Sequence, residues 1–67
     1  MLSIKVCIAG KSRVLKFTGR VSVENLLERL CINPDTVVVL RNGEVTPEFE
    51  RLSEGDRVEI IDIVSRG

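Results

Sequence analysis

The sequence predicts an α+β domain in which a mixed sheet of four or five strands packs on one helix. Two segments at the start of the chain alternate apolar and polar residues, a pattern typical of half-buried strands. Residues 21–32 then place apolar side chains at helical spacing. Two further runs rich in β-branched residues, 36–41 and 57–64, supply more strands.

The length and charge of the chain limit the class of protein. Its 67 residues predict one domain, 1–67, because so short a chain cannot support two cores. The 43% apolar and 30% charged residues indicate a soluble domain that folds without metal or crosslinks. Ten basic and ten acidic residues cancel, so the composition favours neither nucleic acid nor a membrane surface as a partner.

The cysteine content indicates a reducing compartment. Small secreted scaffolds usually carry four or more cysteines, whereas this chain has Cys7 and Cys31 alone, and no signal peptide precedes Met1. We therefore expect a cytoplasmic protein whose thiols pack as small apolar side chains. The lack of histidine excludes a protein-only zinc site, and no apolar run reaches the roughly 20 residues that span a bilayer.

The first two elements are predicted to form a hairpin. Residues 2–9 alternate, with every second side chain apolar and suited to a core: Leu2, Ile4, Val6 and Ile8. Gly10-Lys11 fits a two-residue type II′ turn, which needs positive φ at its first central position. A second strand over 12–18 then directs Leu15 and Phe17 to the same core.

The helix prediction is based on an apolar stripe and on signals at both ends. The stripe consists of residues at helical spacing: Val23, Leu26, Leu27, Leu30 and Cys31. Ser22 is a natural N-cap, and Val21 with Leu26 occupies the two positions of a hydrophobic staple. Pro34 disfavours helical geometry in the residue before it, so the helix should end by about Ile32.

The next segment is predicted to be a central strand followed by a turn. Residues 36–41 are apolar on both faces and rich in valine, as expected of a strand covered on both sides. Asn42-Gly43 is a strong hairpin signal, because both residues tolerate positive φ. A brief strand over 44–46 should end at Pro47.

The rest of the chain predicts an irregular stretch and one last strand. Residues 47–56 should form a turn of helix plus a loop, with Phe49 and Leu52 as the apolar anchors. Residues 57–64 read as the final strand. If that strand lies between the first and third strands, parallel to the first, the fold is a β-grasp. Periodicity alone leaves an open-faced α+β sandwich of another topology as the alternative.

The sequence contains no catalytic constellation. It has no histidine, no tyrosine and no phosphate-binding loop, and its carboxylates are scattered over turns, helix and strand. Its two rings, Phe17 and Phe49, are assigned to the core. The residues therefore predict a protein that is not an enzyme.

The second half of the chain resembles a known family. Residues 37–67 are similar to the C-terminal half of the ubiquitin-like sulfur carriers of the thiamine and molybdopterin types. The resemblance begins with a valine-rich strand from residue 37 and the turn Asn42-Gly43-Glu44. Leu52, the turn Gly55-Asp56 and the apolar final strand 58–64 follow in the family's order. Residues 21–30 match the family's helix in pattern.

The resemblance implies a ubiquitin-like β-grasp fold and a specific chemistry at the C-terminus. In this family a partner adenylyltransferase uses ATP to activate the terminal glycine, here Gly67, which sulfide converts to a thiocarboxylate. A synthase then accepts the sulfur for thiamine, molybdopterin or tRNA thiolation, and conjugation to proteins is a variant of the same chemistry. The implied protein is a monomeric carrier that binds no cofactor and presents Gly67 on the tail residues Ser65 and Arg66.

One residue departs from the family pattern. These carriers end in two glycines, whereas Arg66 occupies the penultimate position here. Three interpretations follow: the partner accepts arginine, a further glycine is missing, or the domain keeps the fold without the chemistry. The last interpretation is the alternative hypothesis of a non-catalytic β-grasp interaction module.

The sequence also predicts a docking surface. One helix covers one face of such a sheet, so apolar residues on the other face are available to a partner enzyme. We assign Val37, Val39, Ile61 and Ile63 to this patch, with a second buried face as the alternative.

Overall fold

The computed structural model describes residues 1–63, and residues 64–67 lie outside this range. Its elements follow one another along the chain in this order: β1 (Leu2–Ile8), β2 (Lys11–Phe17), α1 (Val23–Arg29), the short 3₁₀ helix η1 (Pro34–Thr36), β3 (Val37–Arg41), β4 (Glu44–Val45) and β5 (Arg57–Asp62).

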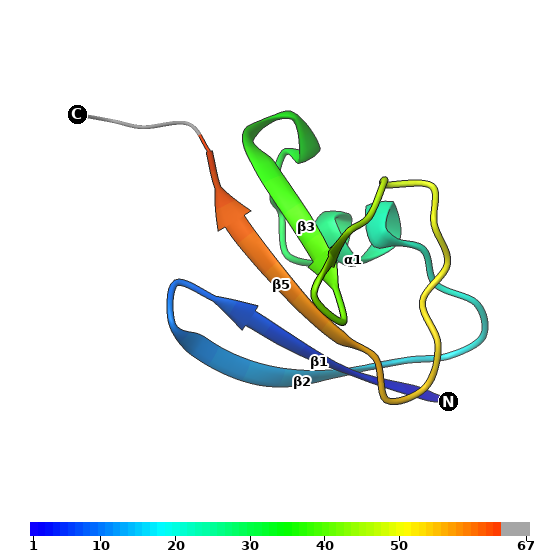
Figure 1. Cartoon of the computed structure of the whole chain (residues 1–67). Helices are drawn as coiled ribbons and strands as arrows, with labels where there is room; N and C mark the ends of the chain where they lie inside the picture. Colours follow the sequence, from blue (N-terminus) through cyan, green and yellow to red (C-terminus); the bar gives the residue numbers. More distant parts are fainter. Residues whose placement is uncertain (64–67) are drawn as a thin grey trace.

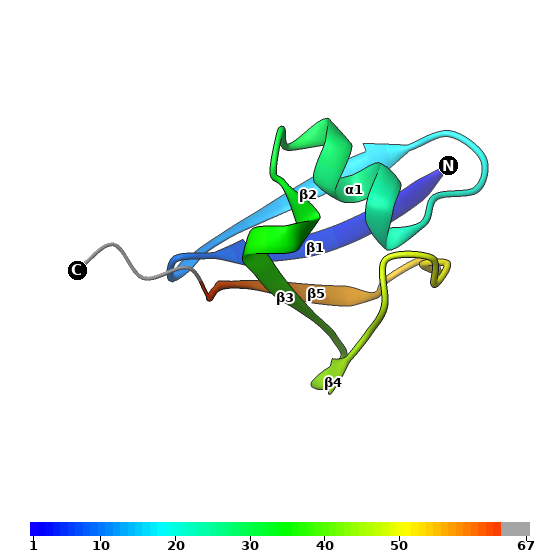
Figure 2. The same cartoon turned by 90° about the horizontal axis from the view of Figure 1, so that it is seen from above.

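The strands form one mixed sheet with the order β2-β1-β5-β3-β4. β5 pairs with β1 in parallel and with β3 in antiparallel orientation, and Figure 1 shows it in orange between these two strands. Figure 2 shows α1 on one side of the sheet, opposite the outer face. The predicted ubiquitin-like β-grasp is therefore confirmed, and the alternative sandwich topology is not adopted.

The core lies between α1 and the central strands. Its buried apolar side chains come from β1, β3, β5, α1 and two flanking segments: Ile4, Val6, Val39, Val58, Ile60, Val23, Leu26, Leu27, Val21 and Leu52. Leu15 and Phe17 of β2 pack against this cluster from the edge, as the sequence predicts. The core therefore depends mainly on β1 and β5, and α1 covers it on one side.

The first hairpin turn lies one residue earlier than predicted. Ile8 pairs with Lys11, so the two loop residues are Ala9 and Gly10. Their φ angles of 52° and 81° are both positive, as in a type I′ turn. The Gly10-Lys11 prediction is wrong because it used the glycine alone as the signal, whereas Ala9 adopts the left-handed conformation despite its Cβ.

The start of α1 matches the prediction, and the helix ends three residues before Ile32, the predicted limit. The Asn25 amide donates to Ser22 Oγ at 3.2 Å, and the Ser22 amide donates to Asn25 Oδ1 at 3.1 Å, which makes a capping box. The helix ends at Arg29, with Leu30 as its C-cap, because Cys31 takes a left-handed φ of 60°. Cys31 is consequently exposed, so its predicted packing as a buried thiol is wrong.

The segment 46–56 is held by main-chain hydrogen bonds to the start of the helix. The Val23 amide donates to the Glu50 carbonyl at 2.9 Å, and the Leu52 amide donates to the Val21 carbonyl at 2.8 Å. The segment forms turns at 48–49 and 54–55, the first closed by the Glu50 amide, which donates to the Pro47 carbonyl at 3.1 Å, and the predicted turn of helix is absent from it. Leu52 is buried as predicted, but Phe49 is 77% exposed, and its assignment to the core is wrong.

The carboxylate of Asp56 joins three parts of the chain that are distant in sequence. Its oxygens accept from Arg41 Nε at 2.7 Å, from the Ser53 amide at 2.7 Å and from Asn42 Nδ2 at 3.3 Å. The carbonyl of Asp56 also accepts from the Lys5 amide at 3.0 Å. Asp56 is buried, and it thereby fixes the turn before β5 to the β3–β4 turn and to β1.

We expect Asp56→Asn to lower the free energy of unfolding by about 2 kcal/mol. The substitution replaces charge-assisted hydrogen bonds with neutral ones, and the NH₂ group of the new amide faces a donor where the carboxylate had an acceptor oxygen. Urea unfolding followed by circular dichroism measures this loss. Glu48→Gln is the matched control, because Glu48 is exposed. Equal stability of the two variants would contradict the role assigned to Asp56.

The stabilisation by Asp56 should be lost in acid. Burial raises the pKa of the Asp56 carboxyl, but hydrogen bonds from the Ser53 amide, Arg41 and Asn42 outweigh it and hold the pKa below the ordinary value of 3.8. The ionised group therefore stabilises the fold above that value, and the contribution disappears as the pH falls through the lower folded pKa. The wild type and Asp56→Asn should therefore differ in their free energy of unfolding above about pH 4, and this difference should shrink only below that pH. Urea unfolding at a series of pH values measures it.

Candidate functional site

The candidate site is the carboxyl end of β5, from which the chain continues into residues 64–67. The Ile63 amide donates to the Thr36 carbonyl at 3.0 Å, so the ladder between β3 and β5 extends to the last described residue. On the other side, Ile60 near the end of β5 pairs with Ile8 of β1. The sheet therefore holds β5 on both sides as far as Ile60, and the β3 side continues to hold it as far as Ile63.

An apolar patch covers the outer face of the sheet beside this end. We call it the outer patch and define it by five side chains on β3, β4 and β5: Val38, Leu40, Val45, Ile61 and Ile63. Val38 pairs with Ile61, and Leu40 pairs with Val45, so strand alternation places them on one face. Ile61 is 40%, Ile63 56% and Val45 74% exposed.

The register assigns the valines of β3 differently from the prediction. Val39 pairs with Ile60 and is buried, and Val37 pairs with Asp62 and packs against the core. The prediction that Val37 and Val39 belong to an exposed patch is therefore wrong. Ile61 and Ile63 are exposed, and their docking role stays a prediction.

The sequence prediction missed Val38, Leu40 and Val45. Three successive valines give no alternation from which the inner and outer faces of β3 could be told apart. The Asn42-Gly43 turn offered a usable signal, because a two-residue turn there pairs Leu40 with Val45 on one face.

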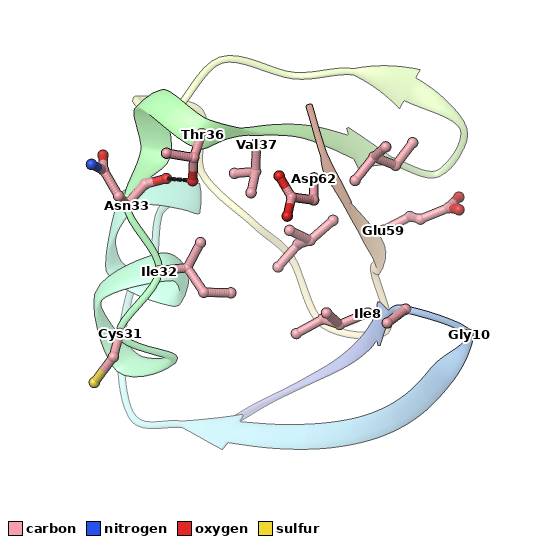
Figure 3. Close-up of a pocket in the computed structure, with 12 residues that line it drawn as sticks. Ile8, Gly10, Cys31, Ile32, Asn33, Thr36, Val37, Glu59 and Asp62 are labelled. Carbon is pink, nitrogen blue, oxygen red and sulfur yellow. Dashed lines mark hydrogen bonds between the residues drawn. The ribbon is translucent and has the colours of Figure 1, made fainter. Parts of the chain in front are cut away.

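A hollow of about 570 Å³ lies on the other side of the same strand end. Figure 3 shows Ile32 entering it from the segment after α1 and Ile8 from β1, with the Asp62 carboxylate beside Val37. The Cys31 side chain points away from the hollow. The hollow exists because α1 ends at Arg29 and leaves the ends of β1 and β5 without a helical cover.

Within residues 1–63 no group of three or more histidine, cysteine, aspartate or glutamate side chains could hold a metal ion. The displaced pKa of Asp56 belongs to a structural carboxylate, because this residue precedes β5 and lies at its opposite end. The arrangement can present the chain end and a docking surface next to it.

The other predicted site residues, Ser65, Arg66 and Gly67, lie outside the described residues. Their roles stay predictions. Within the described range, no helix is long and apolar enough to cross a membrane.

Comparison with known proteins identifies a family and a shared fold. The sequence model of the ThiS family matches residues 5–67. The thiamine biosynthesis protein ThiS from Geobacter metallireducens is 25% identical, with a TM-score of 0.67 over 94% of this chain and 99% of that chain.

Two further solved structures match over nearly their whole length. SAMP1 from Haloferax volcanii has a TM-score of 0.76 at 20% identity, over 97% of this chain and 99% of that chain. A ubiquitin from Caldiarchaeum subterraneum has a TM-score of 0.74 at 20% identity, over 98% of both chains. At this identity the two likenesses show the fold alone.

The opposite faces assigned to Val39 and Ile61 predict opposite responses to the same substitution. Val39→Glu buries a charge in the core and should cost several kcal/mol, enough to prevent folding of so small a domain. Ile61→Glu places the charge in solvent and should change stability by less than about 1 kcal/mol. Thermal unfolding of both variants measures the difference. Similar melting temperatures would show that the register of β3 and β5 is wrong.

Proposed function

The chain belongs to the ThiS family of ubiquitin-like sulfur carriers, and on this basis we propose that the carboxylate of Gly67 is the group that carries sulfur. A partner adenylyltransferase joins this carboxylate to the AMP portion of ATP and releases pyrophosphate. Sulfide then attacks the acyl carbon and expels AMP, which leaves a thiocarboxylate. A synthase takes the sulfur from it.

The observation that carries this proposal is the extent of the family match, which runs to the last residue, Gly67. Elementary chemistry supports it, because a free carboxylate is a poor electrophile and needs activation before sulfide can attack. Glycine suits a chain end that enters a narrow enzyme site, since it has no Cβ and tolerates unusual backbone angles.

The outer patch gives the activating enzyme a surface to dock on. It lies beside the root of the terminal segment, and its exposed isoleucines, Ile61 and Ile63, offer apolar area at the rim of the sheet. A partner bound there receives the chain end directly. The fold itself supplies no base or nucleophile for the reaction in this proposal, so the protein acts as a carrier and the partner as the enzyme.

Thiamine biosynthesis is the first pathway to test. The Geobacter metallireducens relative is a thiamine biosynthesis protein, whereas molybdopterin synthesis and tRNA thiolation have no comparable support. We place the carrier in the cytoplasm, because Cys7 and Cys31 are both free and fit a reducing compartment.

Incubation of the full chain with ATP, sulfide and the cognate adenylyltransferase should raise the intact mass by about 16 Da, the difference between sulfur and oxygen. Deletion of Gly67 should abolish the shift. Ile61→Glu should slow the reaction about tenfold through a higher KM, because it charges the docking surface. Phe49→Glu is the matched control, since Phe49 is exposed outside the outer patch.

A second candidate function follows from Arg66, whose side chain departs from the glycine expected at that position. Under this alternative the domain is an interaction module that binds through the outer patch without terminal chemistry. Removal of residues 65–67 would then leave partner binding and the cellular phenotype intact, while Ile61→Glu would abolish both. An unchanged mass with an enzyme that charges its own known carrier would refute the sulfur-carrier proposal.

A further inference from the structure

The zero net charge of the chain conceals a strong segregation of charge. Residues 1–23 contain five basic residues and no acidic one: Lys5, Lys11, Arg13, Lys16 and Arg20. All ten acidic residues fall between Glu24 and Asp62. The hairpin of β1 and β2 is therefore positively charged, and the remainder of the described chain is negatively charged.

Within residues 1–63, the positive hairpin ends in an unpaired sheet edge. β2 is seven residues long and lies at the end of the strand order, with β1 as its neighbour in the sheet. The two-residue turn makes Ile8 and Lys11 a hydrogen-bonded pair, and antiparallel alternation then turns the main-chain groups of Ser12, Val14 and Lys16 away from β1. The Lys16 carbonyl accepts from Arg29 Nη1 at 3.5 Å, as this outward orientation requires.

Cations flank this edge on both faces of the sheet. Lys11 and Arg13 pair with Ile8 and Val6, so they lie on the α1 side, whereas Lys16 lies on the outer face. All three are exposed, and none forms an ion pair with another residue of the described range. Val14 lies on the same outer face as Lys16 and is 59% exposed. Unpaired main-chain groups, unpaired cations and an apolar side chain thus coincide on one strand.

We propose that the edge of β2 binds an extended acidic segment of a partner protein, which adds to the sheet as a further strand. Its main chain pairs with the outward groups of Ser12 and Val14. Carboxylates at alternate positions lie on the α1 side and face Lys11 and Arg13, whereas Lys16 on the outer face adds to the positive charge along the edge. An apolar residue between the carboxylates contacts Val14.

The same observations disfavour the other partners. A second copy of this chain would bring identical cations to the edge, and such charges keep strand edges from pairing with themselves. Binding of single-stranded nucleic acid uses exposed rings for stacking. Phe17, the ring on β2, packs against the core under the Arg29 guanidinium, 4.9 Å from the ring centroid, and the exposed ring of Phe49 lies outside β2. Nucleic acid also has no peptide groups to pair with Ser12 and Val14.

This site is independent of the proposed sulfur chemistry. In the order β2-β1-β5-β3-β4 the strand β2 lies at one edge, whereas the outer patch covers β5, β3 and β4 on the other half of the sheet. An enzyme docked on the outer patch therefore leaves β2 open. The acidic partner segment and the enzyme on the outer patch therefore do not compete.

The test is a nuclear magnetic resonance titration of the full chain, labelled with ¹⁵N, at low salt. The probe is a blocked seven-residue peptide that alternates glutamate and valine, compared with the corresponding lysine–valine peptide and with oligothymidylate. We expect shifts concentrated on β2 and slower amide exchange at Ser12 and Val14 with the acidic peptide alone. Absence of binding, or shifts with oligothymidylate in place of the peptide, would overturn the proposal.

Two variants separate strand addition from general charge attraction. Val14→Pro removes an outward donor on an edge strand, where proline is tolerated, and should weaken peptide binding about tenfold while the spectrum remains that of a folded protein. Arg13→Glu should weaken it by at least about tenfold. Arg20→Glu makes the same charge change outside β2 and should have less than about a threefold effect. Equal effects of Arg13→Glu and Arg20→Glu, or none from Val14→Pro, would refute strand addition.

Discussion

The parallel pairing of β1 with β5 fixes the position of the core and of both exposed surfaces. It joins residues near the two ends of the chain, with residues 9–56 between them. The pair supplies four core residues, Ile4, Val6, Val58 and Ile60, and the one helix packs over them. Closing so long a loop is entropically unfavourable, so other contacts must hold the register. The hydrogen bonds from the Lys5 amide to Asp56 and from the Gly55 amide to Ser3 do this at the first pairing position.

A central β5 also decides where the two exposed surfaces lie. Because β5 pairs on both sides, its carboxyl end projects from the middle of the sheet beside the outer patch, and the edges fall to β2 and β4. β4 has two residues and offers little to a partner, whereas β2 has seven. A single seven-residue helix cannot cover more than one face. The exposed apolar patch and the open edge are thus consequences of the same topology.

Features that depend on neighbouring residues were predictable from the sequence, and features that depend on distant contacts were not. Ser22 as the N-cap and Asn42-Gly43 as a turn require only local chemistry, and both are correct. Ala9 and Cys31 take positive φ angles that their residue types do not favour. Phe49 is exposed because hydrogen bonds to the helix start fix its segment. Val37 and Val39 were misplaced because no local turn sets the register between β3 and β5.

The surroundings of the chain end also suit the proposed chemistry. An acyl adenylate is attacked by amines and thiolates, so a carrier must keep such groups away from its own activated carboxylate. The hollow beside the end of β5 is lined by apolar, hydroxyl, amide and carboxylate side chains, with one thiol and no lysine among its described residues. That thiol, Cys31, points away from the hollow. The lysines gather instead on the β1–β2 hairpin, where Lys11 adjoins the turn and Lys5 and Lys16 lie along the strands. Charge segregation therefore leaves a basic edge on β2 for the proposed acidic partner, and it leaves the described lining of the hollow beside the end of β5 without a lysine.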